Sequence, residues 1–126
     1  MTSKTDQESV LDEQFAHLDE ALALTRVGGD FELLREVCGL FLDDYPRALE
    51  KIRHAVAVND ASAVEHHAHS LKGSVSTFGA KDVFDCALAL EKQGRSGNLS
   101  GALDGLRTLE NALQALRPDL EALQAR

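Results

Sequence analysis

The sequence predicts an all-α protein, an antiparallel four-helix bundle with an additional short N-terminal helix. The chain of 126 residues contains only two prolines, and no segment alternates apolar and polar residues convincingly with period two. Its apolar residues recur instead at spacings of three and four, which gathers them on one face of a helix. This length suits one domain with one core, which we assign to residues 11–126 after a flexible polar tail at residues 1–10.

The first half of the chain predicts three helices separated by helix-ending residues. A short first helix, which we interpret as a lid, ends near the glycine pair at 28–29. Asp30 is a candidate N-cap for the second helix, which Pro46 should kink or interrupt. The Asn-Asp pair at 59–60 closes that helix and caps the third, which stops at Gly79. The first helix is outlined by Val10, Phe15, Leu18, Leu22 and Leu24.

The second half predicts two further helices. The fourth covers roughly residues 81–93 and runs into a loop at 94–100 that contains two glycines. In the last helix, apolar residues recur every seven positions, a pattern that can form a coiled coil with a second copy of the chain. Pro118 interrupts this seam and the other helices need a partner, so we expect it to pack within the chain and the protein to be a monomer. The seam consists of Leu99, Ala102, Leu106, Leu109, Leu113, Leu116, Leu120 and Leu123.

The third helix places a histidine in solvent. At about 100° per residue, His69 lies roughly 140° from the centre of the apolar stripe and Gly73 roughly 180°. Lys72 and Gly73 follow His69 by three and four residues and so stand beside it. A neutral imidazole can attack phosphorus through its free lone pair, and a neighbouring cation can stabilise the transferred charge. A glycine inside a helix lowers stability by up to about 1 kcal/mol relative to alanine. A docking partner that needs open space at Gly73 explains why a glycine is present there. The stripe consists of Val64, Ala68, Leu71, Val75 and Phe78.

This segment resembles the signature of the histidine-containing phosphotransfer (Hpt) domain family, His-x-Leu-Lys-Gly followed six residues later by Gly-Ala. The resemblance covers the chain from about Leu24 to its end, and only the first two dozen residues lie outside it. It implies that His69 accepts a phosphoryl group from an aspartyl phosphate on a receiver domain and passes it to another receiver. The signature positions are His69, Leu71, Lys72, Gly73, Gly79 and Ala80. The wider resemblance includes residues 28–30, Phe41, residues 59–60, Leu90, Glu91 and residues 95–97.

Other residues around His69 receive supporting roles. No carboxylate cluster in the sequence is typical of a Mg²⁺ site, so we expect no cofactor in this chain and a metal ion supplied by the partner receiver. Glu65, four residues before His69, is a candidate to orient the imidazole, although ordinary solvated charge is the more common meaning of this spacing. We expect Gly73, His66 and Ser76 to contact the docked partner.

Two alternatives to a phosphocarrier remain from the sequence. The first is a non-catalytic helical interaction module, which includes a metal-binding form in which His66 and His69 chelate a transition metal with His67 or His54 as third ligand. An incomplete set of ligands disfavours that metal site. The second is the phosphoacceptor domain of a chemotaxis-type kinase, which would need a further domain to bind ATP. The choice of receivers, the direction of transfer and the output of the pathway are not encoded in recognisable features.

Charge and composition exclude several classes of partner. Thirteen basic and twenty-one acidic residues give a net charge of -8, which disfavours nucleic acid and anionic membranes. We find no segment typical of a membrane span or a signal peptide, and we expect a cytoplasmic protein, with Met1 and the polar tail favouring a free-standing chain over a piece of a hybrid kinase. Cys38 and Cys86 fall within helical apolar patterns and are expected to be reduced.

Overall fold

The computed structural model describes residues 15–126 and contains five helices in that range. They are α2 (Glu20–Arg26), α3 (Phe31–Ala57), α4 (Ala61–Ser76), α5 (Lys81–Ser96) and α6 (Ala102–Gln124). The described part of the chain has no β-strand, which confirms the predicted all-α class. The tail predicted at residues 1–10, and Val10 with it, lies outside the described residues.

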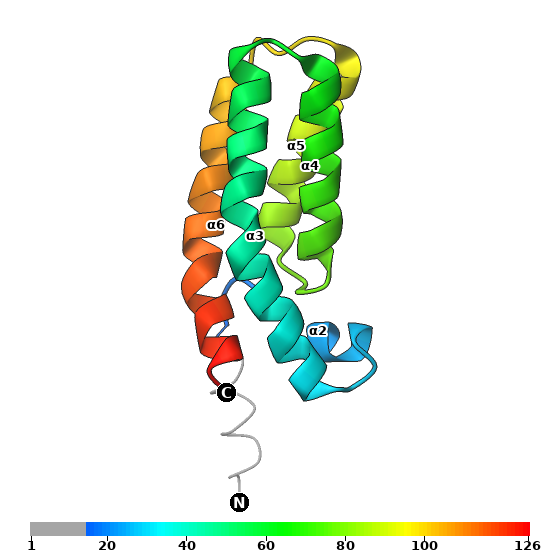
Figure 1. Cartoon of the computed structure of the whole chain (residues 1–126), viewed down its shortest axis with the longest axis vertical. Coiled ribbons are helices and arrows are strands. Elements are labelled where there is room, and N and C mark those ends of the chain that lie inside the picture. The colour runs from blue at the N-terminus through cyan, green and yellow to red at the C-terminus, as the bar shows by residue number, and fades with distance from the viewer. Residues whose placement is uncertain (1–14) are drawn as a thin grey trace, which may run out of the picture.

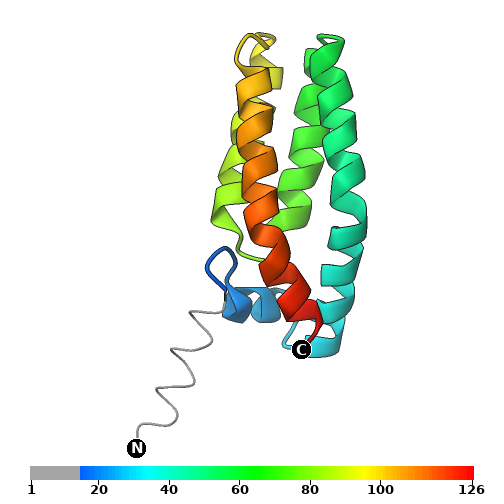
Figure 2. The same cartoon turned by 90° about the vertical axis from the view of Figure 1, so that its left-hand side faces the viewer.

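Helices α3 to α6 form the predicted four-helix bundle (Figures 1 and 2). Helix α3 packs against α4 and α6, and α5 packs against the same two helices, so each helix has two neighbours. The short helix α2 lies across the end of the bundle at which α4 ends and α5 begins (Figure 1). It is attached there by the backbone N–H of Asp19, which donates to the carbonyl of Phe78 at 2.9 Å.

Aspartate caps begin three of the helices. The side chains of Asp19, Asp30 and Asp60 accept hydrogen bonds from backbone N–H groups three residues further along. Caps of this kind satisfy N–H groups that the first helical turn leaves without a partner. Asp30 and Asp60 confirm the predicted starts of the second and third helices. Helix α4 ends at Ser76, three residues before the predicted stop at Gly79, and Gly79 itself adopts a φ of 62° in the turn that follows.

The first short helix starts later than predicted. Phe15 and Leu18 are buried, as their apolar character indicates, but they precede α2 in a non-helical segment. The Asp19 cap sets the start of α2 at Glu20. The segment is instead fixed by the backbone N–H of His17, which donates to Asp119 Oδ2 of α6 at 2.9 Å.

Both prolines lie inside continuous helices. Helix α3 passes through Pro46 and is not interrupted, although Figure 1 shows its N-terminal part inclined to the rest, as expected where a hydrogen bond is lost. Helix α6 also continues past Pro118, so the expected interruption of the seam is wrong. The seam packs within the same chain, as predicted, because its leucines from Leu106 to Leu123 are buried.

The core is made of the inward-facing apolar residues of all five helices. Cys38 is buried in it, Cys86 is half-buried, and both are free thiols. Burial raises the pKa of the Cys38 thiol to about 11, so this sulfur stays protonated at neutral pH. No helix in the described range is long and apolar enough to cross a membrane.

Candidate functional site

His69 lies on the solvent-facing side of α4, as the helical periodicity predicts. Its side chain is 65% exposed, whereas Val64, Ala68, Leu71 and Val75 on the opposite face are buried. The imidazole is therefore accessible to a second protein while its helix is fixed by the core.

The partner of the imidazole is Glu91, which sequence reasoning did not single out for this role. Glu91 projects from α5, and its Oε2 atom lies 3.0 Å from His69 Nδ1. The carboxylate is buried, with only 4% of its side chain exposed. A buried carboxylate at this nitrogen favours the tautomer in which Nδ1 carries the hydrogen and donates it to Glu91. The lone pair then belongs to Nε2, which has no hydrogen-bond partner within residues 15–126.

Lys72 is also bound to Glu91 and is not the exposed cation that we expected. Its Nζ lies 2.8 Å from Glu91 Oε1, and its side chain is only 19% exposed. The same ammonium group lies 5.8 Å from the centre of the Phe84 ring. The aliphatic stem of a lysine can bury itself along apolar surface in this way, which a helical wheel alone does not reveal.

Glu65, the candidate to orient the imidazole, does not take that role in the structure. Glu65 accepts a hydrogen bond from Arg95 Nε at 2.9 Å, and Glu91 takes the position at the histidine. Arg95 also donates through its terminal nitrogen to Glu91 Oε2, again at 2.9 Å. Arg95 thus joins α4 to α5 on one side of His69, and Lys72 does so through Glu91 on the other.

The charges around Glu91 keep it ionised. Hydrogen bonding to Lys72 is the largest influence that lowers the pKa of Glu91, and contact with His69 adds to it. Burial acts in the opposite direction but is outweighed. The site therefore holds a buried negative charge directly behind an exposed imidazole.

A close approach of α4 and α5 makes this network possible. A Cβ atom on Gly94 of α5 would lie 2.5 Å from the backbone nitrogen of Glu65 and 2.7 Å from the carbonyl oxygen of Ala61. Only glycine fits between the two backbones at this point. We expected Gly94 to mark the exit of the fourth helix, but α5 continues through it to Ser96 and ends at Gly97, which has a φ of 79°.

The three residues expected to contact a partner differ in their surroundings. A Cβ atom on Gly73 would meet nothing within 4 Å, so the space beside the helix is open there. His66 is exposed, and its ring lies 5.1 Å from that of His67. Ser76 is half-buried, and its hydroxyl donates to the carbonyl of Gly73 at 2.7 Å. Its own carbonyl accepts a hydrogen bond from Arg26 of α2.

Residues 36–119 match the model of the Hpt domain family. The chain belongs to this family. It is a histidine phosphotransfer protein of a phosphorelay, a phosphocarrier rather than a self-sufficient enzyme, as the resemblance in the sequence implied.

Relatives of the Hpt chain support the same assignment. The chain is 27% identical over 118 residues to histidine-containing phosphotransfer protein 2 of Arabidopsis thaliana. The aligned region covers 91% of this chain and 73% of that protein. The chain is 28% identical over 113 residues to histidine-containing phosphotransfer protein 4 of the same plant, with 88% and 86% covered. The crystal structure of histidine-containing phosphotransfer protein B from Pseudomonas aeruginosa PAO1 superposes with a TM-score of 0.81 at 25% identity, covering 87% of this chain and 96% of that one.

A hollow in the Hpt surface adjoins the histidine. It has a volume of about 360 Å³. It extends from His69 toward the N-terminus of α4, and its lining residues are Ser62, Glu65, His66, His69, Glu91 and Arg95.

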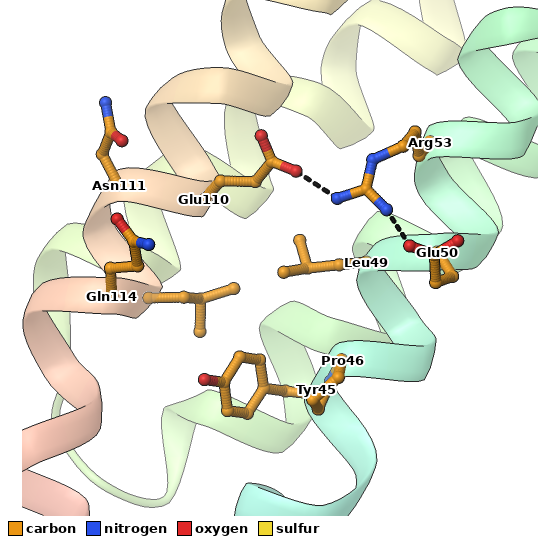
Figure 3. A pocket seen from close by; sticks show the side chains of 9 residues that line it. Tyr45, Pro46, Leu49, Glu50, Arg53, Glu110, Asn111 and Gln114 are labelled. Carbon is orange, nitrogen blue, oxygen red and sulfur yellow. Dashed lines mark hydrogen bonds and ion pairs between the residues drawn. The ribbon is translucent and has the colours of Figure 1, made fainter.

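A second hollow, between α3 and α6, contains none of the predicted site residues (Figure 3). Its volume is about 460 Å³, and Arg53 closes one end by pairing with both Glu50 and Glu110. Within residues 15–126, no three histidine, cysteine or acidic side chains are grouped so as to hold a metal ion. The structure therefore gives no support to the alternative metal site at His66 and His69.

Proposed function

We propose that His69 is the phosphoacceptor of this Hpt domain and that it carries the phosphoryl group on Nε2. The observation that carries the proposal is the contact between His69 Nδ1 and the buried carboxylate of Glu91 at 3.0 Å. This contact occupies one ring nitrogen and leaves the lone pair of the other directed away from Glu91. The exposed ring can then reach a phosphoryl donor on another protein.

The proposed transfer is a displacement at phosphorus. The Nε2 lone pair forms the N–P bond while the bond between phosphorus and the aspartyl oxygen of the receiver breaks, and its electron pair leaves with the aspartate. Because Nδ1 keeps its hydrogen, the ring becomes a positively charged imidazolium. Glu91 stabilises that charge as it develops, and the buried position of the carboxylate makes the interaction stronger than it would be in water.

We place the Mg²⁺ ion on the receiver. The carboxylate in contact with the imidazole is Glu91, and its two oxygens are already contacted by Lys72, His69 and Arg95. A magnesium ion prefers free oxygen ligands and several waters, which this arrangement does not offer. The receiver thus supplies the metal and the aspartate, while the Hpt domain supplies an oriented nucleophile.

The receiver is proposed to dock over the face of α4 that contains Gly73, with His66 and Ser76 at its margins. The open space at Gly73 lets the backbone of a partner come close to the helix. We further propose that the protein is a monomer, since the leucine seam of α6 is buried within the bundle. We propose the cytoplasm as its location.

Transfer from a panel of phosphorylated receivers tests the proposal. The parent chain should gain a label that is lost in acid and survives in base, as expected for a phosphoramidate. His69→Gln should abolish labelling without changing helical content, while His67→Gln, a control on the same helix that does not line the hollow beside His69, should label normally. Persistent labelling of the His69→Gln protein would show that another residue is the acceptor.

A further inference from the structure

We infer, resting on the proposed function, that Arg95 is a phosphoryl-binding residue. When His69 is phosphorylated, the guanidinium of Arg95 leaves Glu65 and binds the oxygens of the phosphoryl group, while Lys72 stays on Glu91. This assigns the stabilising role to a cation on α5 instead of the lysine expected from the sequence.

Arg95 occupies the right place for this role. It lines the same hollow as His69, and both side chains contact a single atom, Glu91 Oε2. His69 Nδ1 and the terminal nitrogen of Arg95 therefore lie no further apart than the sum of those two contacts, 3.0 Å and 2.9 Å. The long, flexible arginine side chain can turn from Glu65 toward a group bonded to the ring.

Arg95 is also easier to move than Lys72. Its side chain is 60% exposed, and it pairs both with Glu65, whose side chain is 36% exposed, and with the buried Glu91. Only the pair with Glu65 is exchanged, because the nitrogen that contacts Glu91 can stay there. Ion pairs between exposed side chains are weak and screened by salt, so exchange of Glu65 for another anion costs little. The side chain of Lys72 is 19% exposed and neutralises a carboxylate that is 4% exposed. Withdrawing Lys72 would leave buried charge without its nearest cation, which is strongly unfavourable.

The chemistry of the two cations points the same way. A guanidinium presents its donors in a planar fork that matches two oxygens of a phosphate, whereas an ammonium acts as a point charge. The phosphoryl group brings negative charge into a hollow that already contains Glu65 and Glu91. Arg95 neutralises the new charge, and the released Glu65 can be solvated at the surface. No bond to Arg95 forms or breaks, so it returns to Glu65 when the phosphoryl group leaves.

Titration of the phosphorylated chain tests this assignment without a receiver. Phosphoramidate serves as the donor: His69 Nε2 attacks phosphorus, the P–N bond of the reagent breaks and ammonia leaves. The pH at which the phosphoryl group takes up its proton is then measured by ³¹P NMR. An adjacent cation lowers this midpoint, so Arg95→Gln should raise it by about one pH unit. Arg95→Lys keeps the charge but loses the fork, and should give an intermediate value.

Two further variants separate Arg95 from general charge effects. Lys92→Gln removes an exposed cation from the same helix that does not line the hollow, and should leave the midpoint nearly unchanged. Lys72→Gln should shift it by less than half as much as Arg95→Gln. Glu65→Gln should lower the midpoint in the parent by releasing Arg95, and this effect should shrink in the Arg95→Gln background, as a double-mutant cycle reveals.

The outcomes distinguish this inference from the proposed function. If His69 is phosphorylated and the titration midpoint of the phosphoryl group is the same in Arg95→Gln as in Lys92→Gln, the inference is wrong. The assignment of His69 as phosphoacceptor then still stands. A larger shift from Lys72→Gln than from Arg95→Gln would also overturn it and restore the lysine to the role. If phosphoramidate produces no phosphohistidine at His69 in the folded parent, the proposed function fails and this inference fails with it.

Discussion

Two glycines near the site should respond in opposite ways to the same substitution. Gly73 and Gly94 both lie inside helices, but a Cβ atom on Gly73 meets nothing within 4 Å. Gly73→Ala should therefore stabilise the protein through helix propensity, by roughly 0.5 to 1 kcal/mol. For a domain of this size the melting temperature should rise by about 2 to 5 °C.

Gly94→Ala is the matched comparison and should destabilise. The added methyl group would lie 2.5 Å and 2.7 Å from backbone atoms of α4, which can yield only if the two helices separate. Overpacking of this kind costs typically 1 to 3 kcal/mol, more than the gain in propensity. Because Glu91 is on the same helix less than a turn away, separation of the helices should also weaken its contact with His69.

Thermal and denaturant melts of the two variants, together with transfer rates, provide the assay. Gly73→Leu should remain folded but transfer phosphate about a hundredfold more slowly, since a displacement of about 1 Å at a reacting centre can have that effect. Destabilisation by Gly73→Ala would mean that Gly73 contacts the core. A Gly94→Ala protein as stable as the parent would refute the close approach of α4 and α5, and unimpaired transfer by Gly73→Leu would refute the docking face.

Three further predictions concern buried groups. The pKa of Glu91 is lower in the folded than in the unfolded chain, so its contribution to stability is complete above the unfolded pKa of about 4.3 and is lost as pH falls through the folded pKa. Glu91→Gln should therefore make the free energy of unfolding less dependent on pH in denaturant melts between about pH 3 and 6. Lys72→Ala should lower the free energy of unfolding by about 1 to 3 kcal/mol, against less than about 0.5 kcal/mol for Lys92→Ala, and equal losses would contradict the buried ion pair. Cys38 should resist a thiol reagent at pH 8 until the chain unfolds, and rapid labelling of it in the native protein would contradict its burial.

The fold was predictable because its determinants are local. Apolar periodicity identified the four long helices, and Asp30 and Asp60 marked the starts of two of them. The exposure of His69 followed from the same periodicity. The start of α2 was not recovered, since Phe15 and Leu18 are apolar and buried without being helical, and only the Asp19 cap distinguishes the two cases.

The site was predictable only in part because it depends on two helices at once. The position of His69 and the open space at Gly73 are properties of α4 alone. Glu91, Lys72 and Arg95 meet because Gly94 allows α5 to approach α4, which sets the distance between the helices. The available signals were the glycine inside a helix and a glutamate next to the apolar Leu90, and neither specifies a partner on another helix.

The choice between the two ring nitrogens of His69 tests the central claim most directly. With the histidines labelled with ¹⁵N, long-range ¹H–¹⁵N correlation and coupling to ³¹P identify the nitrogen bonded to phosphorus in the phosphorylated protein. Our account predicts phosphorus on Nε2 of His69, with the hydrogen on Nδ1 directed to Glu91. Phosphorus on Nδ1, or on any other histidine, would contradict the orientation of the imidazole by Glu91 and with it the proposed mechanism.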